Sequence, residues 1–230
     1  MIKPIIFNTE MVRAILAGTK TQTRRIVKGI EGLNVYRAEP SEDSYQSLAQ
    51  WDFFYGWTDE NGIYDAIESV KAPYTVGDVL WVRETWCKYW LPGEHVLYRY
   101  KASHPNGNKR PTSPEYDEPY EIRLWKPSIH MPKDAARIFL RVTNVRAERL
   151  QDCVKGWCLD VEKEGIKPHQ DPILYLTDDD YHAALRDAMQ KLWDSTIKGV
   201  DLPVYGWDAN HWVWVIEFER CDRPEGWCEE

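Results

Sequence analysis

The chain has 230 residues, of which 43% are hydrophobic and 29% charged, a balance typical of a globular core with a hydrated surface. Its formal net charge of −8 argues against a protein that binds duplex DNA through phosphate contacts, because such proteins usually present a basic face. No stretch approaches the roughly 18 apolar residues of a membrane span and none resembles a signal peptide, so we expect a cytoplasmic protein with no membrane contact.

Charged and aromatic residues are unevenly distributed. Residues 31–68 carry nine acids against Arg37, whereas residues 1–30 carry only Glu10 as an acid beside six basic residues: Lys3, Arg13, Lys20, Arg24, Arg25 and Lys28. The chain also holds 12 Trp and 13 Tyr, whose flat rings fill cores and stack on planar ligands. A local basic site on an acidic body favours a small anionic or nucleotide ligand over a long nucleic acid.

The first half of the chain predicts a strand, a helix and an insertion. A short strand is expected over residues 3–7, followed by a helix that Asn8 or Thr9 caps and a left-handed Gly18 ends. Residues 29–70 are acidic, aromatic and weakly periodic. We interpret them as an insertion with a hairpin near residues 59–62.

The next segments predict strands separated by a second insertion. A turn at residues 76–78 leads into a buried strand ending at Arg83. Residues 88–128 form the second insertion, with strands expected over 96–100 and 120–124 on either side of a turn at 104–108. The clearest strand follows over 138–148, where apolar and polar residues alternate.

The last third predicts helices and a closing strand. A short helical or loop piece runs to residue 166, and Thr177 caps a helix that extends through Trp193. A buried strand over 212–218 closes the domain. The predicted fold is therefore α+β: a mixed β-barrel with two flanking helices and two long insertions, one domain over residues 1–220 with a tail over 221–230.

We expect the catalytic residues in the basic segment that follows Gly18. A Lys two residues after a helix-ending Gly is held on a tight turn, and burial near Arg24 and Arg25 would lower its pKa so that Lys20 acts as a base. Thr23 offers a hydroxyl for such a base to activate, and Glu164 a carboxylic acid to protonate a leaving amine. These groups are the parts that amide hydrolysis needs.

The segment resembles the signature of the ASCH family, a Gly-x-Lys-x-x-Thr pattern at the mouth of a PUA-like barrel, which Gly18, Lys20 and Thr23 fill. Residues 77–86, Glu164 with its following Gly, and the strand over 212–218 are also similar to parts of that family. The likeness covers residues 1–28, 76–86 and 129–218 and is nearest to the larger versions found in phages and prophages.

The resemblance implies an activity and roles for three residues. Small bacterial ASCH proteins remove the acetyl group from N4-acetylcytidine, with the Lys as proton acceptor, the Thr as nucleophile and a downstream Glu as proton donor. Lys20, Thr23 and Glu164 take those roles by resemblance, with Glu162 and Glu84 as rivals for the acid. The chain departs from the small enzymes in its greater length and its tandem Arg24-Arg25.

Other side chains are expected to bind the substrate. Trp81 and Trp86 flank Glu84 on a strand and its end, where one ring can stack a base, although Trp81 fits a core role better. The full set of expected binding residues is Arg24, Arg25, Trp81, Arg83, Glu84, Trp86 and Asn210.

Two further functions remain open. The same cleft in a module without catalysis would bind single-stranded RNA or a modified nucleic acid, with Arg24 and Arg25 on phosphates. A ribonuclease is the less favoured of these two functions, because the sequence offers no pair of His residues to act as its acid and base. We expect no cofactor and no metal, since a zinc site from Cys221, Cys228 and His211 fits no common spacing.

Overall fold

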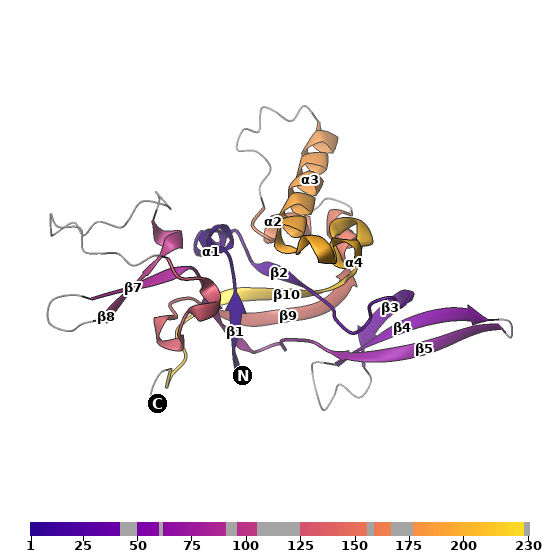
Figure 1. The fold of residues 1–230 in the computed structure, drawn as a ribbon, viewed down its shortest axis with the longest axis horizontal. Coiled ribbons are helices and arrows are strands. Elements are labelled where there is room, and N and C mark those ends of the chain that lie inside the picture. The colour runs from indigo at the N-terminus through magenta and orange to yellow at the C-terminus, as the bar shows by residue number, and fades with distance from the viewer. Residues whose placement is uncertain are drawn as a thin grey trace. The chain divides into compact units, whose positions relative to one another are not determined.

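The computed structural model describes residues 1–41, 50–59, 62–90, 96–104, 125–155, 159–166 and 177–227. These residues form an α+β structure whose strands make sheets of five, three and two strands (Figure 1). The five-stranded sheet has the order β1-β6-β9-β10-β2, and none of the sheets closes on itself within the described ranges. The α+β class is therefore confirmed, and the PUA-like barrel is not.

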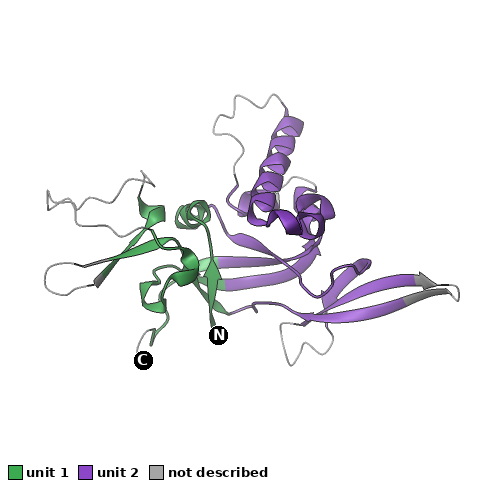
Figure 2. Cartoon of the chain, in the orientation of Figure 1, with its two compact units in different colours: residues 1–18, 78–141, 219–230 green, residues 19–77, 142–218 purple. Residues whose placement is uncertain are grey.

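The chain divides into two compact units (Figure 2). Unit 1 consists of Met1–Gly18, Asp78–Arg141 and Glu219–Glu230, and unit 2 of Thr19–Gly77 and Val142–Phe218. The expectation of a single domain over residues 1–220 stays a prediction.

Unit 1 is built on two sheet segments and one helix. β1 and β6 are parallel with Ile2 opposite Val79, and β6 is antiparallel to the start of β9, with Val79 opposite Arg141. β7 and β8 form an antiparallel pair, so the strand expected over 96–100 is confirmed. The strand expected over 120–124 and residues 105–108 of the expected turn lie outside the described residues. The elements are β1 (Ile2–Ile6), α1 (Thr9–Leu16), β6 (Val79–Arg83), β7 (Trp86–Trp90), β8 (Val96–Tyr100) and the first three residues of β9 (Phe139–Arg149), which continues into unit 2.

Helix α1 starts and stops where its sequence predicts. The side chain of Asn8 caps it by accepting a hydrogen bond from the backbone N–H of Met11 at 2.8 Å. Its buried face carries Val12 and Ile15. Gly18 follows with a φ of 74°, a left-handed conformation that side-chain-bearing residues rarely adopt. The chain can therefore turn sharply just before Lys20.

The core of unit 1 includes part of the segment that was expected to be a tail. Trp227 is buried and its ring lies edge-on to Phe139, with 5.1 Å between the ring centroids. Its indole nitrogen donates a hydrogen bond to the backbone carbonyl of Lys133 at 3.2 Å. Trp227 and the partly buried Cys221 thus belong to the core cluster of unit 1, although the residues between them are largely exposed.

Unit 2 contains a three-stranded sheet, most of the helices, and strands shared with the five-stranded sheet. β2 is antiparallel to β10 with Arg24 opposite Val215. The insertion over 29–70 holds the antiparallel sheet β3-β4-β5, and the pair Asp59 and Gly62 confirms its expected hairpin. The elements are β2 (Gln22–Ile26), β3 (Val35–Pro40), β4 (Gln50–Asp59), β5 (Gly62–Lys71), α2 (Leu159–Lys163), α3 (Asp178–Thr196), α4 (Leu202–Tyr205) and β10 (Trp212–Cys221).

The paired strands β2 and β10 have two different faces. One face packs on helices, because Val213 and Val215 belong to the same core cluster as Leu185 and Met189 of α3. The other face is aromatic: Trp212 and Trp214 both lie edge-on to Phe53 of β4. Since successive side chains of a strand point to opposite faces, each residue of β2 can be assigned to one of them. We call them the helix face and the aromatic face.

The expected helix after Thr177 is confirmed as α3. Thr177 and Asp180 cap it reciprocally, each side chain accepting from the other residue's backbone N–H. None of the helices in the described ranges has both the length and the apolar composition that crossing a bilayer requires.

Candidate functional site

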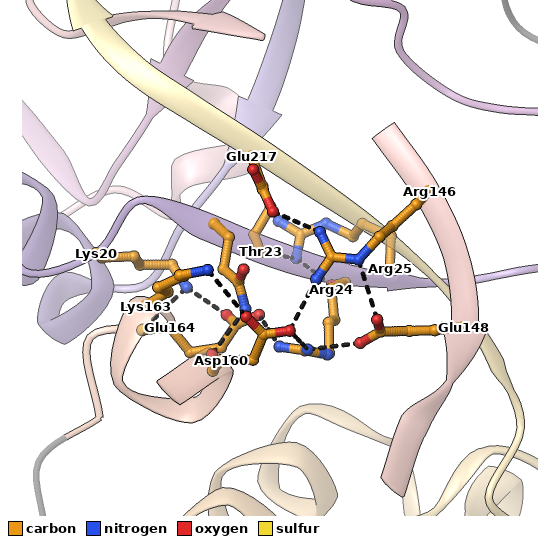
Figure 3. Close-up of polar contacts among 11 residues, drawn as sticks. Lys20, Thr23, Arg24, Arg25, Arg146, Glu148, Asp160, Lys163, Glu164 and Glu217 are labelled. Carbon is orange, nitrogen blue, oxygen red and sulfur yellow. Dashed lines mark hydrogen bonds and ion pairs between the residues drawn. The ribbon is translucent and has the colours of Figure 1, made fainter. Parts of the chain in front are cut away.

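A buried pair of opposite charges, Lys20 and Glu164, lies just before β2, where the two residues form an isolated antiparallel β-bridge. The Lys20 Nζ donates hydrogen bonds to Oε2 of Glu164 at 2.6 Å and to the backbone carbonyl of the same residue at 3.0 Å (Figure 3). Only 2% of Lys20 and 5% of Glu164 is exposed. A backbone hydrogen bond also links the two segments that carry Lys20 and Glu164, because the N–H of Thr21 donates to the carbonyl of Lys163 at 2.9 Å. The structure therefore brings together two of the three residues expected to be catalytic.

Burial changes the proton affinity of this lysine. The loss of solvent around Lys20 lowers its pKa below the ordinary 10.5, although the charge and hydrogen bond of Glu164 oppose that shift. The nearby cations Arg25 and Arg24 lower the pKa further. A lysine in this position gives up its proton more easily than one on the surface.

Arg24 holds the other oxygen of the same carboxylate. Its Nη1 donates to Oε1 of Glu164 at 2.8 Å, and its Nη2 donates to Oε1 of Glu148 at 2.6 Å. Burial alone would lower the pKa of Arg24, but these two carboxylates raise it. Because an arginine does not lose its proton in proteins, Arg24 fixes the Glu164 carboxylate without exchanging protons with it.

A partly exposed ring of charges extends this network. Arg146 donates to Asp160 at 2.8 Å and to Glu148 at 3.1 Å, and it also pairs with Glu217. Burial would raise the pKa of Asp160, but its hydrogen bond from Lys163 and the nearby charge of Arg146 lower it. The side chains of Arg146 and Asp160 are 27% and 28% exposed, so this is where solvent reaches the network.

Thr23 does not join Lys20. Gln22 and Arg24 bond to Asp160 and Glu164, which places them on the helix face, and Thr23 therefore points to the aromatic face. Among the described residues, its hydroxyl accepts a hydrogen bond from Nη1 of Arg25 at 2.9 Å. Alternation along β2 thus places Thr23 on the face opposite to Gln22 and Arg24, and its role as nucleophile stays a prediction.

Arg25 shares the aromatic face with Thr23. Its Nη1 also donates to the backbone carbonyl of Arg24 at 2.9 Å. Burial lowers the pKa of Arg25, while Tyr74 and Glu164 oppose the shift. The side chains of the tandem arginines leave β2 on opposite faces, but the Arg25 charge lies close enough to Lys20 and Glu164 to interact with both.

The rival carboxylates have other partners. Glu162 is exposed and accepts a hydrogen bond from the hydroxyl of Tyr181 at 2.5 Å. Glu84 belongs to unit 1, where Nε and Nη2 of Arg137 donate to its two oxygens at 2.7 and 2.9 Å. Burial raises the pKa of Glu84, and Arg137 opposes that rise. Glu84 is thus the acid of an arginine ion pair.

The other expected binding residues of unit 1 pack within that unit. Trp86 is 4% exposed and contacts Tyr98, with 5.6 Å between the ring centroids. Trp81 lies edge-on to Trp227 at 5.8 Å, and Arg83 donates to the backbone carbonyl of Ile129. Their roles in binding a substrate stay predictions.

The side chains of Asn210 and His211 both contact the protein backbone. Asn210 has a φ of 46°, and its Oδ1 accepts from the backbone N–H of Gln151 at 2.8 Å. His211 is buried and its Nε2 lies 2.8 Å from the carbonyl of Val27. The zinc alternative includes Cys228, which lies outside the described residues. A left-handed Asn that bonds the backbone has a local reason to be there.

Sequence reasoning missed several members of the network. Arg146 and Glu148 were available as charged residues at alternate positions of the strand over 138–148, a pattern that marks one polar side of that strand. The residues missed are Gln22, Arg146, Glu148, Asp160 and Glu217. No family model, no curated protein and no solved structure matches this chain.

Proposed function

We propose that unit 2 carries the active site of an ASCH-type nucleoside amidohydrolase, which removes an acyl group from the exocyclic amine of a cytosine-type base. The observation that carries this proposal is the buried contact of 2.6 Å between the Lys20 amine and the Glu164 carboxylate. The order of Gly18, Lys20 and Glu164 along the chain supports the same class of enzyme.

The pair of Lys20 and Glu164 is suited to proton transfer. The lowered pKa of Lys20 favours its neutral amine more than in an exposed lysine. At 2.6 Å the carboxylate is within reach of the same proton. Arg24 keeps that carboxylate in place through its second oxygen.

Hydrolysis breaks the bond between the acyl carbon and the exocyclic nitrogen and consumes one water. In the proposed reaction the Lys20–Glu164 pair takes a proton from the attacking water and returns it to the leaving nitrogen. We take water as the nucleophile, because alternation along β2 turns Thr23 away from Gln22 and Arg24 and its hydroxyl accepts from Arg25. Thr23 positions Arg25 in this account.

The test is release of cytidine from N4-acetylcytidine by the purified protein, measured by chromatography. Lys20→Arg keeps the charge but does not titrate, so we expect its rate to fall by about 100-fold or more. Lys155→Arg makes the same change at an exposed lysine and should match the wild type. Equal rates for wild type and Lys20→Arg, or no release by the wild type, would remove the proposal.

Binding of a modified base or single-stranded RNA without chemistry is the second candidate. Two exposed lysines of unit 1 favour it, because Lys126 and Lys133 are available to phosphates while they lie 5.0 and 4.7 Å above the buried rings of Trp86 and Trp227. It predicts salt-sensitive binding that weakens when Lys126 and Lys133 are changed together to Ala. Arg24 is not the residue to change, because its charge is already paired.

A further inference from the structure

Two buried polar atoms beside the Lys20–Glu164 pair have no hydrogen-bond partner within the described part of the chain. They are Oε1 of Gln22 and Nε of Arg24. Gln22 is 0% exposed and Arg24 is 3% exposed. Leaving a buried polar atom unsatisfied costs about 1–3 kcal/mol, so two on one strand call for an explanation.

The chemistry of each atom is fixed by its neighbours. Nε2 of Gln22 donates to the backbone carbonyl of Asp160 at 2.7 Å, and a carbonyl only accepts. The oxygen of that amide is therefore the unpartnered end, an acceptor. Nε of Arg24 is a donor in every state, because the guanidinium stays protonated. The strand thus presents one acceptor and one donor.

These two atoms come from the same side of β2. Gln22 and Arg24 are two residues apart in the strand, which corresponds to about 6–7 Å along its axis. Both side chains belong to the helix face, where Glu164 contacts Arg24 and Lys20 together. A ligand bound to both atoms would therefore lie next to the proton-transfer pair.

We infer that Gln22 and Arg24 determine specificity for the pairing edge of a cytosine-type base. Oε1 of Gln22 accepts the N4–H, and Nε of Arg24 donates to N3. An N4-acylated cytosine keeps one N4–H and its N3 acceptor, whereas uracil presents an oxygen and an N–H in the opposite order. The inference rests on the proposed function, because it places the scissile N4–acyl bond beside Lys20 and Glu164.

A base reaches these atoms only when part of the charged network above them moves. Solvent reaches Arg146 and Asp160 as well as Glu217 and Lys163, and Asp160 also holds the Gln22 amide through its backbone carbonyl. Displacement of Asp160 would therefore expose Gln22 and leave Arg24 bonded to Glu164 and Glu148. Cytosine is preferred over uracil because uracil would leave Oε1 of Gln22 and Nε of Arg24 without hydrogen-bond partners, whereas water can satisfy both atoms in the free protein.

The test compares the binding of cytidine and uridine by calorimetry, with neither compound open to hydrolysis. We expect wild type to bind cytidine about ten-fold or more tightly than uridine. Gln22→Met, which keeps the length of the side chain but removes its oxygen, should reduce that preference to about three-fold or less. Gln50→Met makes the same change at an exposed position and should keep the full preference. Circular dichroism establishes that each variant is folded.

The outcomes separate this inference from the proposed function. Hydrolysis of N4-acetylcytidine without a cytidine preference, or with a preference that Gln22→Met leaves intact, overturns the inference alone. A preference that depends on Gln22 without any hydrolysis overturns the proposed function alone. If Gln22→Met does not fold, a crystal structure of wild type with cytidine decides. Base atoms on Gln22 and Arg24 support the inference, and water alone on both overturns it.

Discussion

Among the described residues, each unit has a glutamate buried against cations, and the two sites differ because only that of unit 2 includes a lysine. In unit 1, Glu84 is 1% exposed and Arg137 donates to both of its oxygens at 2.7 and 2.9 Å. In unit 2, Glu164 bonds Arg24 through one oxygen and Lys20 through the other.

This difference decides what each pair can do. An arginine keeps its proton, so the Glu84 pair can hold structure but cannot pass a proton between its members. A buried lysine changes its pKa readily, and that of Lys20 is lowered. The same acid in two buried pairs thus has a structural role in one unit and, in our proposal, a catalytic role in the other.

The largest expected effect comes from removing the cation of each pair. Lys20→Met should cost about 3–5 kcal/mol of unfolding free energy, because Glu164 keeps a buried charge with one partner fewer. Arg137→Met should cost a similar amount, because Glu84 is 1% exposed and loses the hydrogen bonds to both of its oxygens. Only Lys20→Met should also abolish cytidine release per folded molecule. Urea unfolding and the hydrolysis assay check this, and lost release in folded Arg137→Met would break the comparison.

Changing each glutamate to glutamine sharpens the comparison without altering side-chain size. We expect Glu164→Gln to slow cytidine release by about 100-fold, because the carboxyl can no longer exchange a proton with Lys20. Glu84→Gln should keep the wild-type rate. The assay runs on protein whose folding is verified by circular dichroism. Similar rates for the two variants would contradict the assigned roles.

The two pairs should give stability a pH dependence of opposite sign. The pKa of Lys20 is lowered in the folded protein, so the unfolded chain binds more protons between that value and 10.5, and unfolding free energy rises with pH there. The pKa of Glu84 is raised, so the folded protein binds more protons above 4.5 and unfolding free energy falls as pH rises through that window. Urea unfolding against pH checks both slopes. Lys20→Met should lose the first slope and Glu84→Gln the second.

The smallest expected effect is at Thr23. Thr23→Val removes the hydroxyl that accepts from Arg25 and should cost about 1 kcal/mol of unfolding free energy. Cytidine release should stay within about three-fold of wild type, because one lost hydrogen bond away from the reacting atoms has a small effect. A loss of 100-fold or more would restore Thr23 as the nucleophile. Thr21→Val, at an exposed neighbouring position, is the matched control.

Local sequence signals predicted the elements that frame the site. Asn8 and Gly18 marked both ends of α1, and Thr177 marked the start of α3. The family resemblance assigned Lys20 and Glu164 to one site but did not predict their hydrogen bond, because 144 residues separate them and no local pattern reports such a contact.

The face of Thr23 could not be predicted because β2 does not look like a strand. Residues 22–26 read Gln-Thr-Arg-Arg-Ile, with no alternation of apolar and polar residues to show the period of two. Its buried polar residues are satisfied by distant partners such as Asp160 and Glu148. Trp227 was missed for a related reason, because its contact with Phe139 is long-range.

The central claim is that Lys20 shares a proton with Glu164 in a buried pair, and nuclear magnetic resonance can test it directly. The nitrogen of Lys20 is followed against pH in protein labelled with ¹⁵N-lysine and assigned by comparison with Lys20→Arg. We predict that this nitrogen titrates below the ordinary lysine value of 10.5 and that Glu164→Gln shifts its titration further down, because the opposing carboxylate is gone. Titration at or above 10.5, unchanged by Glu164→Gln, would contradict the account.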